Sequence, residues 1–107
     1  NSYAWDTAIV YIQAMGNSNY ANQTDGNGTL KNTGSTGDEK CKIFDIAGNI
    51  QEWTTEYSTR TTSSYAPACT RRGGTCTTSF YYTSSRFNDD ATLSSRHISF
   101  RSILYVK

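Results

Sequence analysis

The side chains best suited to covalent or metal chemistry in this sequence are Cys41, Cys69, Cys76 and the single histidine, His97. Their spacing fits no zinc-binding pattern, and three cysteines are too few for a disulfide framework. Cys69 and Cys76 are the nearest pair for one disulfide, and three free or buried thiols are the alternative. Only His97 could serve as a base for a cysteine nucleophile, so these residues favour structural roles over catalysis.

A second group of side chains is suited to recognition. Segment 77–90, TTSFYYTSSRFNDD, combines aromatic with short polar residues. Aromatic side chains give large contact areas at a small entropic cost, and short polar ones adapt their hydrogen bonds to a partner. An ordinary polar loop with tyrosines packed on the core is the alternative. The predicted ligand-binding residues, of which all but the two threonines are expected to share one exposed face, are Thr77, Thr78, Phe80, Tyr81, Tyr82, Phe87, Asn88, Asp89 and His97.

The composition excludes several classes of partner. The chain has 107 residues and a net charge of +1, which indicates neither a nucleic acid nor an anionic membrane as partner. No apolar run is long enough to cross a membrane, so no membrane insertion is expected. The length is that of a single domain, 1–107. Since the first residue is not an initiator Met, we expect this domain to be the C-terminal part of a longer chain.

The elements that must position these residues are few. Residues 5–15 predict a helix, because Trp5, Ala8, Ile9 and Ile12 form one apolar stripe. A long Gly- and Asn-rich loop is expected over 16–40. Core-like sequence returns at 43–57, with a turn at 47–49 and an alternating strand over 50–55.

The second half of the chain shows weaker patterns. Residues 58–70 predict another loop, and the glycine pair within 71–76 predicts a bend or a close backbone approach. Residues 77–97 have no helical or strand period. A terminal strand is expected over 98–106, with one face formed by Ile98, Phe100, Leu104 and Val106. The fold class indicated is α+β with little regular secondary structure.

Three segments in order resemble one family. FDIAGNIQEWT at 44–54 is similar to the D-M-A-G-N-V-W-E-W-T segment of formylglycine-generating-enzyme (sulfatase-modifying factor) domains. Residues 72–75 resemble their R-G-G-S segment, and residues 98–101 resemble their closing G-F-R, with Arg86 where the family has a further Arg. Gln51 and Ser99 depart from the motifs. The agreement in order and spacing covers residues 44–106.

The resemblance implies a minimal or truncated form of the C-type-lectin-like fold of this family, in which a few buried residues hold long loops in place. Those residues would be Phe44, Trp53, Phe100 and Leu104. Truncation of Trp53 or Phe100 to Ala is then expected to cost about 3–5 kcal/mol each. The family arginines, Arg72, Arg86 and Arg101, would hydrogen-bond carboxylates and loop carbonyls.

The resemblance also bears on catalysis. The oxidising members hold copper with two cysteines between the R-G-G and G-F-R motifs, and this chain has only Cys76 in that interval. The related iron enzymes need a histidine cluster, and His97 stands alone. We therefore predict no enzymatic activity, no catalytic residues and no required cofactor.

A bias in residue usage indicates how the binding segment arose. Lys, Gln, Glu, Met and Trp occur 12 times in residues 1–56 and never in residues 57–106. These five amino acids have no codon ending in a pyrimidine, and diversity-generating retroelements randomise adenines in AAY-type codons. Their variable proteins are C-type-lectin-like domains of this family, diversified at the C-terminus. The resemblance thus implies a variable region over about 75–99 and a protein or cell-surface ligand.

Other interpretations of the chain remain open at this point. An ordinary surface or phage adhesion domain of the same fold would also bind without catalysis, and a sulfatase-modifying-type oxidase is the third alternative. Display on a bacterial cell surface or a virion is expected. In the family, the Asn and Glu of G-N-x-x-E help to bind calcium, so Asn49 and Glu52 are candidate ligands of a structural calcium. The alternative is a structural Glu52 buried against an arginine.

Overall fold

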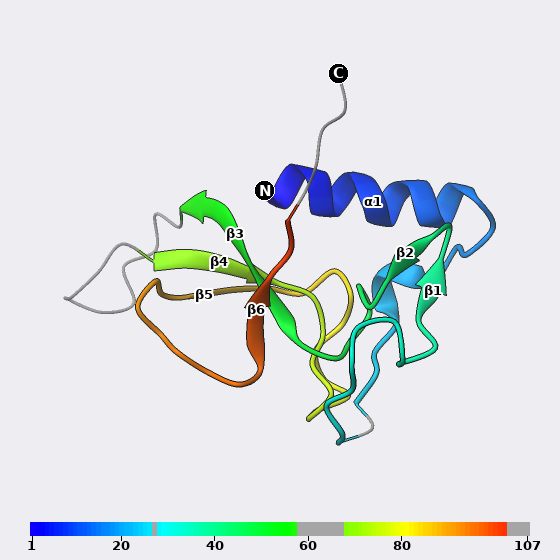
Figure 1. Ribbon diagram of the computed structural model, residues 1–107. Helices are drawn as coiled ribbons and strands as arrows, with labels where there is room; N and C mark the ends of the chain where they lie inside the picture. The colour runs from blue at the N-terminus through cyan, green and yellow to red at the C-terminus, as the bar shows by residue number, and fades with distance from the viewer. Residues whose placement is uncertain (27, 58–67, 103–107) are drawn as a thin grey trace.

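The computed structural model describes residues 1–26, 28–57 and 68–102 of the chain. One α-helix, a short 3-10 helix and two sheets make up the described part (Figure 1), which confirms the α+β class. In chain order, the elements are α1 (Ser2–Ala14), η1 (Tyr20–Asn22), β1 (Glu39–Lys40), β2 (Ile43–Phe44), β3 (Gln51–Tyr57), β4 (Ala68–Arg72), β5 (Arg86–Asp90) and β6 (Ile98–Phe100).

Helix α1 forms where the apolar stripe predicted it, but it starts three residues earlier. The side chain of Asn1 caps the first turn by accepting a hydrogen bond from the Ala4 N–H at 2.9 Å. Trp5, Ile9 and Ile12 are buried, as the stripe requires. The helix ends just before Gly16, whose φ of +103° suits a glycine.

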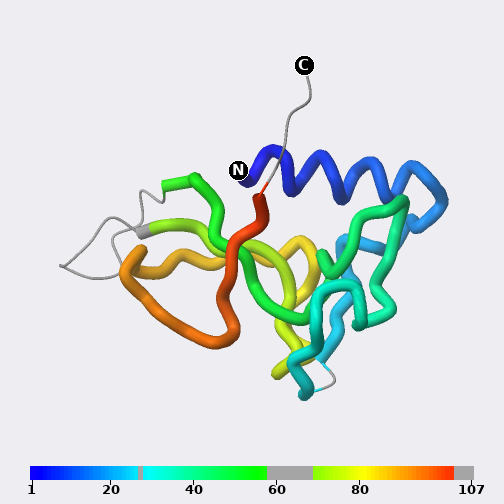
Figure 2. Tube along the Cα trace, viewed as in Figure 1, coloured from blue at the N-terminus to red at the C-terminus, as the bar shows by residue number. Residues whose placement is uncertain are grey.

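The larger sheet has the strand order β5-β4-β3-β6. Strands β3, β4 and β5 are antiparallel neighbours, and β6 lies parallel to β3 on the other side. The connection from β5 to β6 loops away from α1 (Figure 2). Strands β1 and β2 form a separate antiparallel hairpin.

Two strands of this sheet contradict the sequence prediction. Strand β4 falls partly in the predicted 58–70 loop, and β5 falls in the segment without a period. Their sequences, ACTRR and RFNDD, are too polar to show apolar alternation. Pairing with a neighbouring strand, which local sequence does not encode, supplies their backbone hydrogen bonds.

The hydrophobic core lies between α1, η1 and the turn after β2. Its buried members are Trp5, Ile9, Ile12, Tyr20, Ile46 and Ala47. Tyr20 was assigned to a polar loop by its sequence, yet it is completely buried. Its hydroxyl donates to the Asp38 carboxylate, with oxygen distances of 2.8 and 3.0 Å. Burial and then Asp38 raise the pKa of Tyr20 above its ordinary value.

The predicted buried aromatics do not form this core. Phe44 and Trp53 are half-buried, Leu104 lies outside the described residues, and Phe100 is 75% exposed. The prediction for Phe100 is therefore wrong. The strand expected over 98–106 is described as β6 at Ile98–Phe100, with residues 103–107 outside the described part of the chain. The helix covers the other face of the sheet, so the side chain of Phe100 is left outside.

Helix α1 packs over the central strands β3 and β4 through polar contacts. Arg72 of β4 forms an ion pair with Asp6 of the helix. Thr54 of β3 contacts Ser2, with 3.3 Å between the hydroxyl oxygens. The face that carries Thr54 and Arg72 is thus the covered face of the sheet, and the face that points away from α1 is called the open face below.

Candidate binding face

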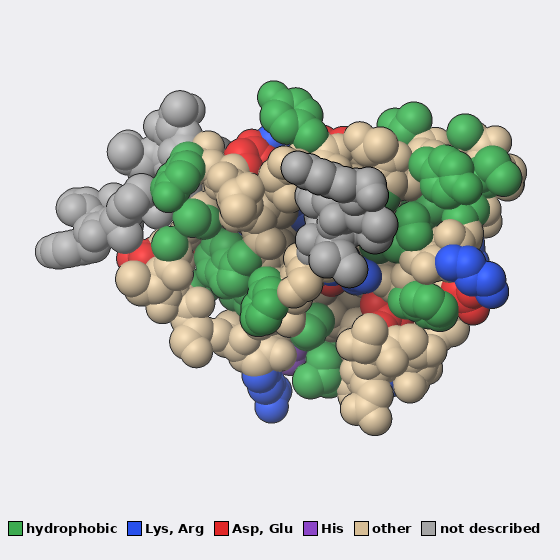
Figure 3. Space-filling view, turned by 45° about the horizontal axis from the view of Figure 1, so that its top comes forward, with side chains coloured by type: hydrophobic (Ala, Val, Ile, Leu, Met, Phe, Trp, Pro, Cys, Tyr) green, Lys and Arg blue, Asp and Glu red, His purple; other side chains and the backbone are tan. Residues whose placement is uncertain are grey.

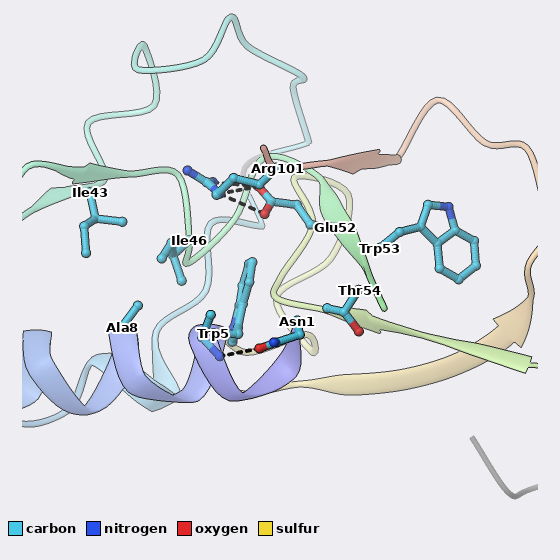
Figure 4. Close-up of a pocket in the computed structure, with 10 residues that line it drawn as sticks. Asn1, Trp5, Ala8, Ile43, Ile46, Glu52, Trp53, Thr54 and Arg101 are labelled. Carbon is cyan, nitrogen blue, oxygen red and sulfur yellow. Dashed lines mark hydrogen bonds and ion pairs between the residues drawn. The ribbon is translucent and has the colours of Figure 1, made fainter. Parts of the chain in front are cut away.

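A row of four side chains crosses the open face from one edge of the sheet to the other. Trp53 is the register partner of Phe100 on β6 and of Arg71 on β4, and Arg71 is the partner of Phe87 on β5. Register partners point to the same side of a sheet, so these side chains share one face. Figure 4 shows Trp53 pointing away from the helix, on the opposite side of β3 from Glu52.

Tyr81 extends this row beyond the sheet. Its ring meets that of Phe87 edge-on, with the centroids 4.6 Å apart at an angle of 60°. Such pairs contribute about 0.5–1.5 kcal/mol beyond the area they bury. We call Tyr81, Phe87, Arg71, Trp53 and Phe100 the aromatic row.

Arg71 links the two halves of the aromatic row. Its guanidinium lies over the Phe87 ring, 5.8 Å from the centroid. It also donates hydrogen bonds to the side chains of Gln51 and Asp89. The pair with Asp89 neutralises the charge, and these contacts together fix the Arg71 side chain. The open face is therefore preorganised for binding. The Arg71–Asp89 ion pair adds no net charge to it.

The structure brings some of the predicted ligand-binding residues together. Tyr81, Phe87 and Asp89 lie on the open face, linked through Arg71. Phe80 and Tyr82 flank Tyr81 and are 81% and 46% exposed. In the space-filling view, hydrophobic side chains lie on the surface over the strands (Figure 3).

Asn88 is a correction to the prediction of one shared face. It lies between Phe87 and Asp89 on β5, and strand alternation turns it to the opposite side of the sheet. There its side-chain oxygen accepts a hydrogen bond of 3.0 Å from the hydroxyl of Thr70, which is completely buried. Asn88 therefore belongs to the framework.

Three further predicted residues have local contacts instead of contacts with the aromatic row. The Thr77 hydroxyl lies 2.7 Å from that of Thr75, and the Thr78 hydroxyl accepts from the Phe80 N–H at 3.1 Å. His97 precedes β6, where its Nε2 accepts from the Arg96 side chain at 3.0 Å. No contact described for Thr77, Thr78 or His97 joins them to the row, so the group on one face is smaller than predicted.

Sequence reasoning missed three members of the row. Trp53 and Phe100 were assigned to the core, and Arg71 was placed in a glycine-containing bend. The alternation predicted over residues 50–55 already puts Trp53 and Glu52 on opposite faces, and this was the available signal. The sequence does not say which of those faces the helix covers.

The glycine pair of the R-G-G-T motif lies where other backbone and ring atoms leave no room for a side chain. Gly73 has a φ of +90°, and a Cβ there would lie 2.8 Å from the Trp5 ring. A Cβ on Gly74 would lie 2.3 Å from the Ala47 oxygen and 2.7 Å from the Tyr81 oxygen. The predicted close approach is confirmed, and it brings the segment before Tyr82 against the core.

The three family arginines pair with carboxylates, as predicted. Arg72 pairs with Asp6, Arg86 with Glu56, and Arg101 with Glu52. Arg101 makes the most extensive contact: its Nε donates to Glu52 Oε2 at 2.8 Å and its Nη2 to Oε1 at 2.6 Å. Burial opposes the charge of Arg101, but the hydrogen bonds and charge of Glu52 outweigh it and raise the pKa. The hydrogen bond from Arg86 lowers the pKa of Glu56.

The candidate calcium ligands already have protein partners. The Asn49 amide accepts from the Lys31 N–H at 3.0 Å and donates to the Lys31 carbonyl at 2.9 Å. Both Glu52 oxygens accept from Arg101. Within residues 1–26, 28–57 and 68–102, no group of three or more His, Cys, Asp and Glu could hold a metal. This geometry favours the structural alternative for Glu52, and calcium binding stays an untested prediction.

The three cysteines are free thiols. Cys41 is exposed, Cys69 is half-buried and Cys76 is completely buried. The Cys69–Cys76 disulfide is thus not formed, and the alternative of free or buried thiols describes them. A small cavity of about 120 Å³ lies under α1, and Glu52, Trp5 and Ile46 are among its lining residues (Figure 4). Trp53 of the aromatic row also lines this cavity, so the cavity adjoins the row at β3.

Comparison with known proteins identifies the family of the chain. The sequence model described as "Sulfatase-modifying factor enzyme 1-like domain" matches residues 1–105. No curated protein and no solved structure gives a significant match. In the part of the chain that the structure describes, no helix has the length and apolar character needed to cross a membrane.

Proposed function

Since the chain belongs to the family of sulfatase-modifying factor enzyme 1-like domains, we propose that it is a non-catalytic, ligand-binding member. In this proposal it has the C-type-lectin-like fold and is the variable protein of a diversity-generating retroelement. Its ligand is a protein or another cell-surface molecule, and the domain is displayed on a bacterial surface or a virion.

The observation that carries this proposal is the aromatic row on the open face. Small soluble domains usually cover such side chains, yet Phe100 is 75% exposed, and Phe80, next to Tyr81 in the sequence, is 81% exposed. Exposed aromatic groups held in place around an arginine are typical of recognition sites. The charge-neutral Arg71–Asp89 pair gives no attraction for phosphates, which supports a protein or neutral surface ligand over a nucleic acid.

The arrangement of thiols supports the absence of catalysis. The oxidising relatives need two adjacent cysteines that a substrate thiol reaches. Here Cys76 is completely buried, and its N–H donates to the Asn49 carbonyl at 2.9 Å, inside the framework. Cys69 occupies a strand position opposite Asp89. Cys69 and Cys76 therefore do not form a pair of thiols that a substrate could reach.

The residue bias supports the retroelement origin. Lys, Gln, Glu, Met and Trp are absent from residues 57–106, which include most of the aromatic row. Trp53 lies before this interval, so it belongs to the invariant part of the site in this proposal. An ordinary adhesion domain would have the same face without this origin.

The test of origin is the flanking DNA. We expect a near-identical repeat of the region that encodes the C-terminus, differing mainly at adenines, beside a reverse transcriptase gene. If the locus has neither, the ordinary adhesion domain replaces the retroelement protein.

The test of binding uses replacement at Tyr81 and Tyr82. The double Ala variant should keep its melting temperature within a few degrees and lose binding to the ligand found for the wild-type domain. A matched control is Tyr3→Ala, because Tyr3 is 85% exposed on α1, away from the open face. Equal binding by both variants would place the site elsewhere.

The test of catalysis is direct. Incubation with copper and a cysteine-containing sulfatase peptide should leave the peptide cysteine unchanged. Formylglycine above the level of a protein-free control would overturn the non-catalytic assignment.

A further inference from the structure

Thr83 lies inside the exposed recognition segment, yet it is completely buried. Its N–H donates to the Gln23 carbonyl at 2.9 Å, and its hydroxyl donates to the same oxygen at 3.1 Å. Its own carbonyl accepts from the Trp5 indole N–H at 3.0 Å. The next N–H, of Ser84, donates to the Ala21 carbonyl at 3.0 Å. Four hydrogen bonds thus tie one point of the segment to α1 and to the η1 region.

A closed turn surrounds this buried residue. The Tyr82 N–H donates to the Ser85 hydroxyl at 2.8 Å, and the Ser85 N–H donates to the Tyr82 carbonyl at 2.9 Å. Because Thr83 points into the core, its neighbours are directed outward: Tyr82 is 46% exposed, and Tyr81 reaches the Phe87 ring.

Arg86, the family arginine within this segment, is less suited to be its anchor. It lies at the start of β5, and its side chain is 49% exposed where it pairs with Glu56. An exposed pair of this kind contributes little to the order of a loop. The buried Thr83, with three hydrogen bonds of its own, is the stronger fixed point, because buried hydrogen bonds are costly to leave unmade.

We propose that Thr83 is the positioning residue of the binding face. It holds Tyr81 against Phe87 and divides the segment into two arms, 77–82 and 84–90, which meet at this ring contact. The inference deepens the proposed function, since it says which position within the variable region must stay constant. It predicts that natural variants differ at the flanking aromatics and keep a small hydroxyl residue at 83.

The experiment measures the aromatic contact without any ligand. Thr83→Ala and Thr83→Ser are compared by nuclear magnetic resonance, through ring-to-ring Overhauser effects between Tyr81 and Phe87 and through amide exchange at Ser84. Thr92→Ala is the matched control, because the Thr92 hydroxyl bonds only to nearby Asp90 among its described contacts. Thr83→Ala should weaken the ring contact at least severalfold and speed Ser84 exchange about tenfold, the effect of losing one hydrogen bond. Thr83→Ser should restore both, and Thr92→Ala should change neither.

An unchanged Tyr81–Phe87 contact in Thr83→Ala, with faster Ser84 exchange, would overturn the proposal, because the anchor would be weakened without effect on the face. If Thr83→Ala does not fold, the same two measurements are made on Trp5→Phe, which removes the indole donor to the Thr83 carbonyl and some volume. An unchanged Tyr81–Phe87 contact with faster Ser84 exchange would again overturn the proposal. These measurements need no ligand, so their failure leaves the binding function standing. Retained binding by the Tyr81 and Tyr82 double variant would move the binding site elsewhere and would leave the role of Thr83 as an anchor unaffected.

Discussion

The aromatic row should contribute little to stability compared with the core, and truncation of Phe100 and Trp5 tests this contrast. A phenylalanine side chain offers about 200 Å² for burial. Phe100 is 75% exposed, so it buries about 50 Å², which at about 25 cal/mol per Å² gives about 1.2 kcal/mol. Phe100→Ala should therefore lower the free energy of unfolding by about 1 kcal/mol.

Trp5 provides the opposite extreme. It is 7% exposed and donates a hydrogen bond to the Thr83 carbonyl at 3.0 Å. Trp5→Ala should cost about 3–5 kcal/mol for the lost aromatic and about 1 kcal/mol more for the carbonyl left without its donor. In a domain of this size, that sum approaches the total stability.

The assay is urea unfolding followed by far-ultraviolet circular dichroism, with equal slopes required for all variants. Tyr3→Ala, at a side chain that is 85% exposed on α1, serves as the control for an aromatic outside both regions. If Phe100→Ala destabilises the domain by 3 kcal/mol or more, Phe100 is core, and the reasoning that assigns the open face to binding is refuted.

Three further outcomes follow from single contacts. Because the folded state raises the pKa of Tyr20, its contribution to the free energy of unfolding should be fully present below the unfolded pKa of about 10 and should fall as the pH rises above it. Between pH 8 and 11, the melting temperature of Tyr20→Phe should therefore fall less than that of the wild type, and identical pH profiles would contradict this. Gly74→Ala should cost about 1–3 kcal/mol or more, because its Cβ would lie within 2.7 Å of two backbone oxygens; an unchanged melting temperature would show that the two segments separate easily. Glu52→Gln should cost about 2–3 kcal/mol, since it leaves the part-buried Arg101 charge without its partner; a urea midpoint equal to that of the wild type would argue against this pair as a structural contact.

The sequence by itself determined the helix, the central strand and the family. The stripe of Trp5, Ile9 and Ile12 has the helical period, and these residues are buried. Residues 50–55 predict a strand, and β3 forms over Gln51–Tyr57. These features are local, because a period of 3.6 or 2 is written into neighbouring residues whatever the rest of the chain does. The family motifs likewise depend on order along the chain.

The position of Tyr20 and the strands β4 and β5 were decided by tertiary structure. Tyr20 has no apolar neighbours at helical or strand spacing, and only the approach of Asp38 and of the helix makes its site a core. Strands ACTRR and RFNDD form through pairing with distant partners. Such pairing depends on which segments meet in space, and local composition does not record it.

The binding face itself shows the same division most clearly. Alternation determines that Trp53 and Glu52 point to opposite sides of β3, but it does not determine which side is covered. Helix α1 covers the side with Glu52 and Arg72, where Asp6 of the helix pairs with Arg72 and Arg101 pairs with Glu52. Polar side chains are paired beneath the helix, and the aromatic side chains lie on the other face, where Trp53 is half-buried and Phe100 is exposed. Which face the helix covers depends on contacts between segments far apart in the chain, such as Asp6 with Arg72, so only the tertiary structure determines it.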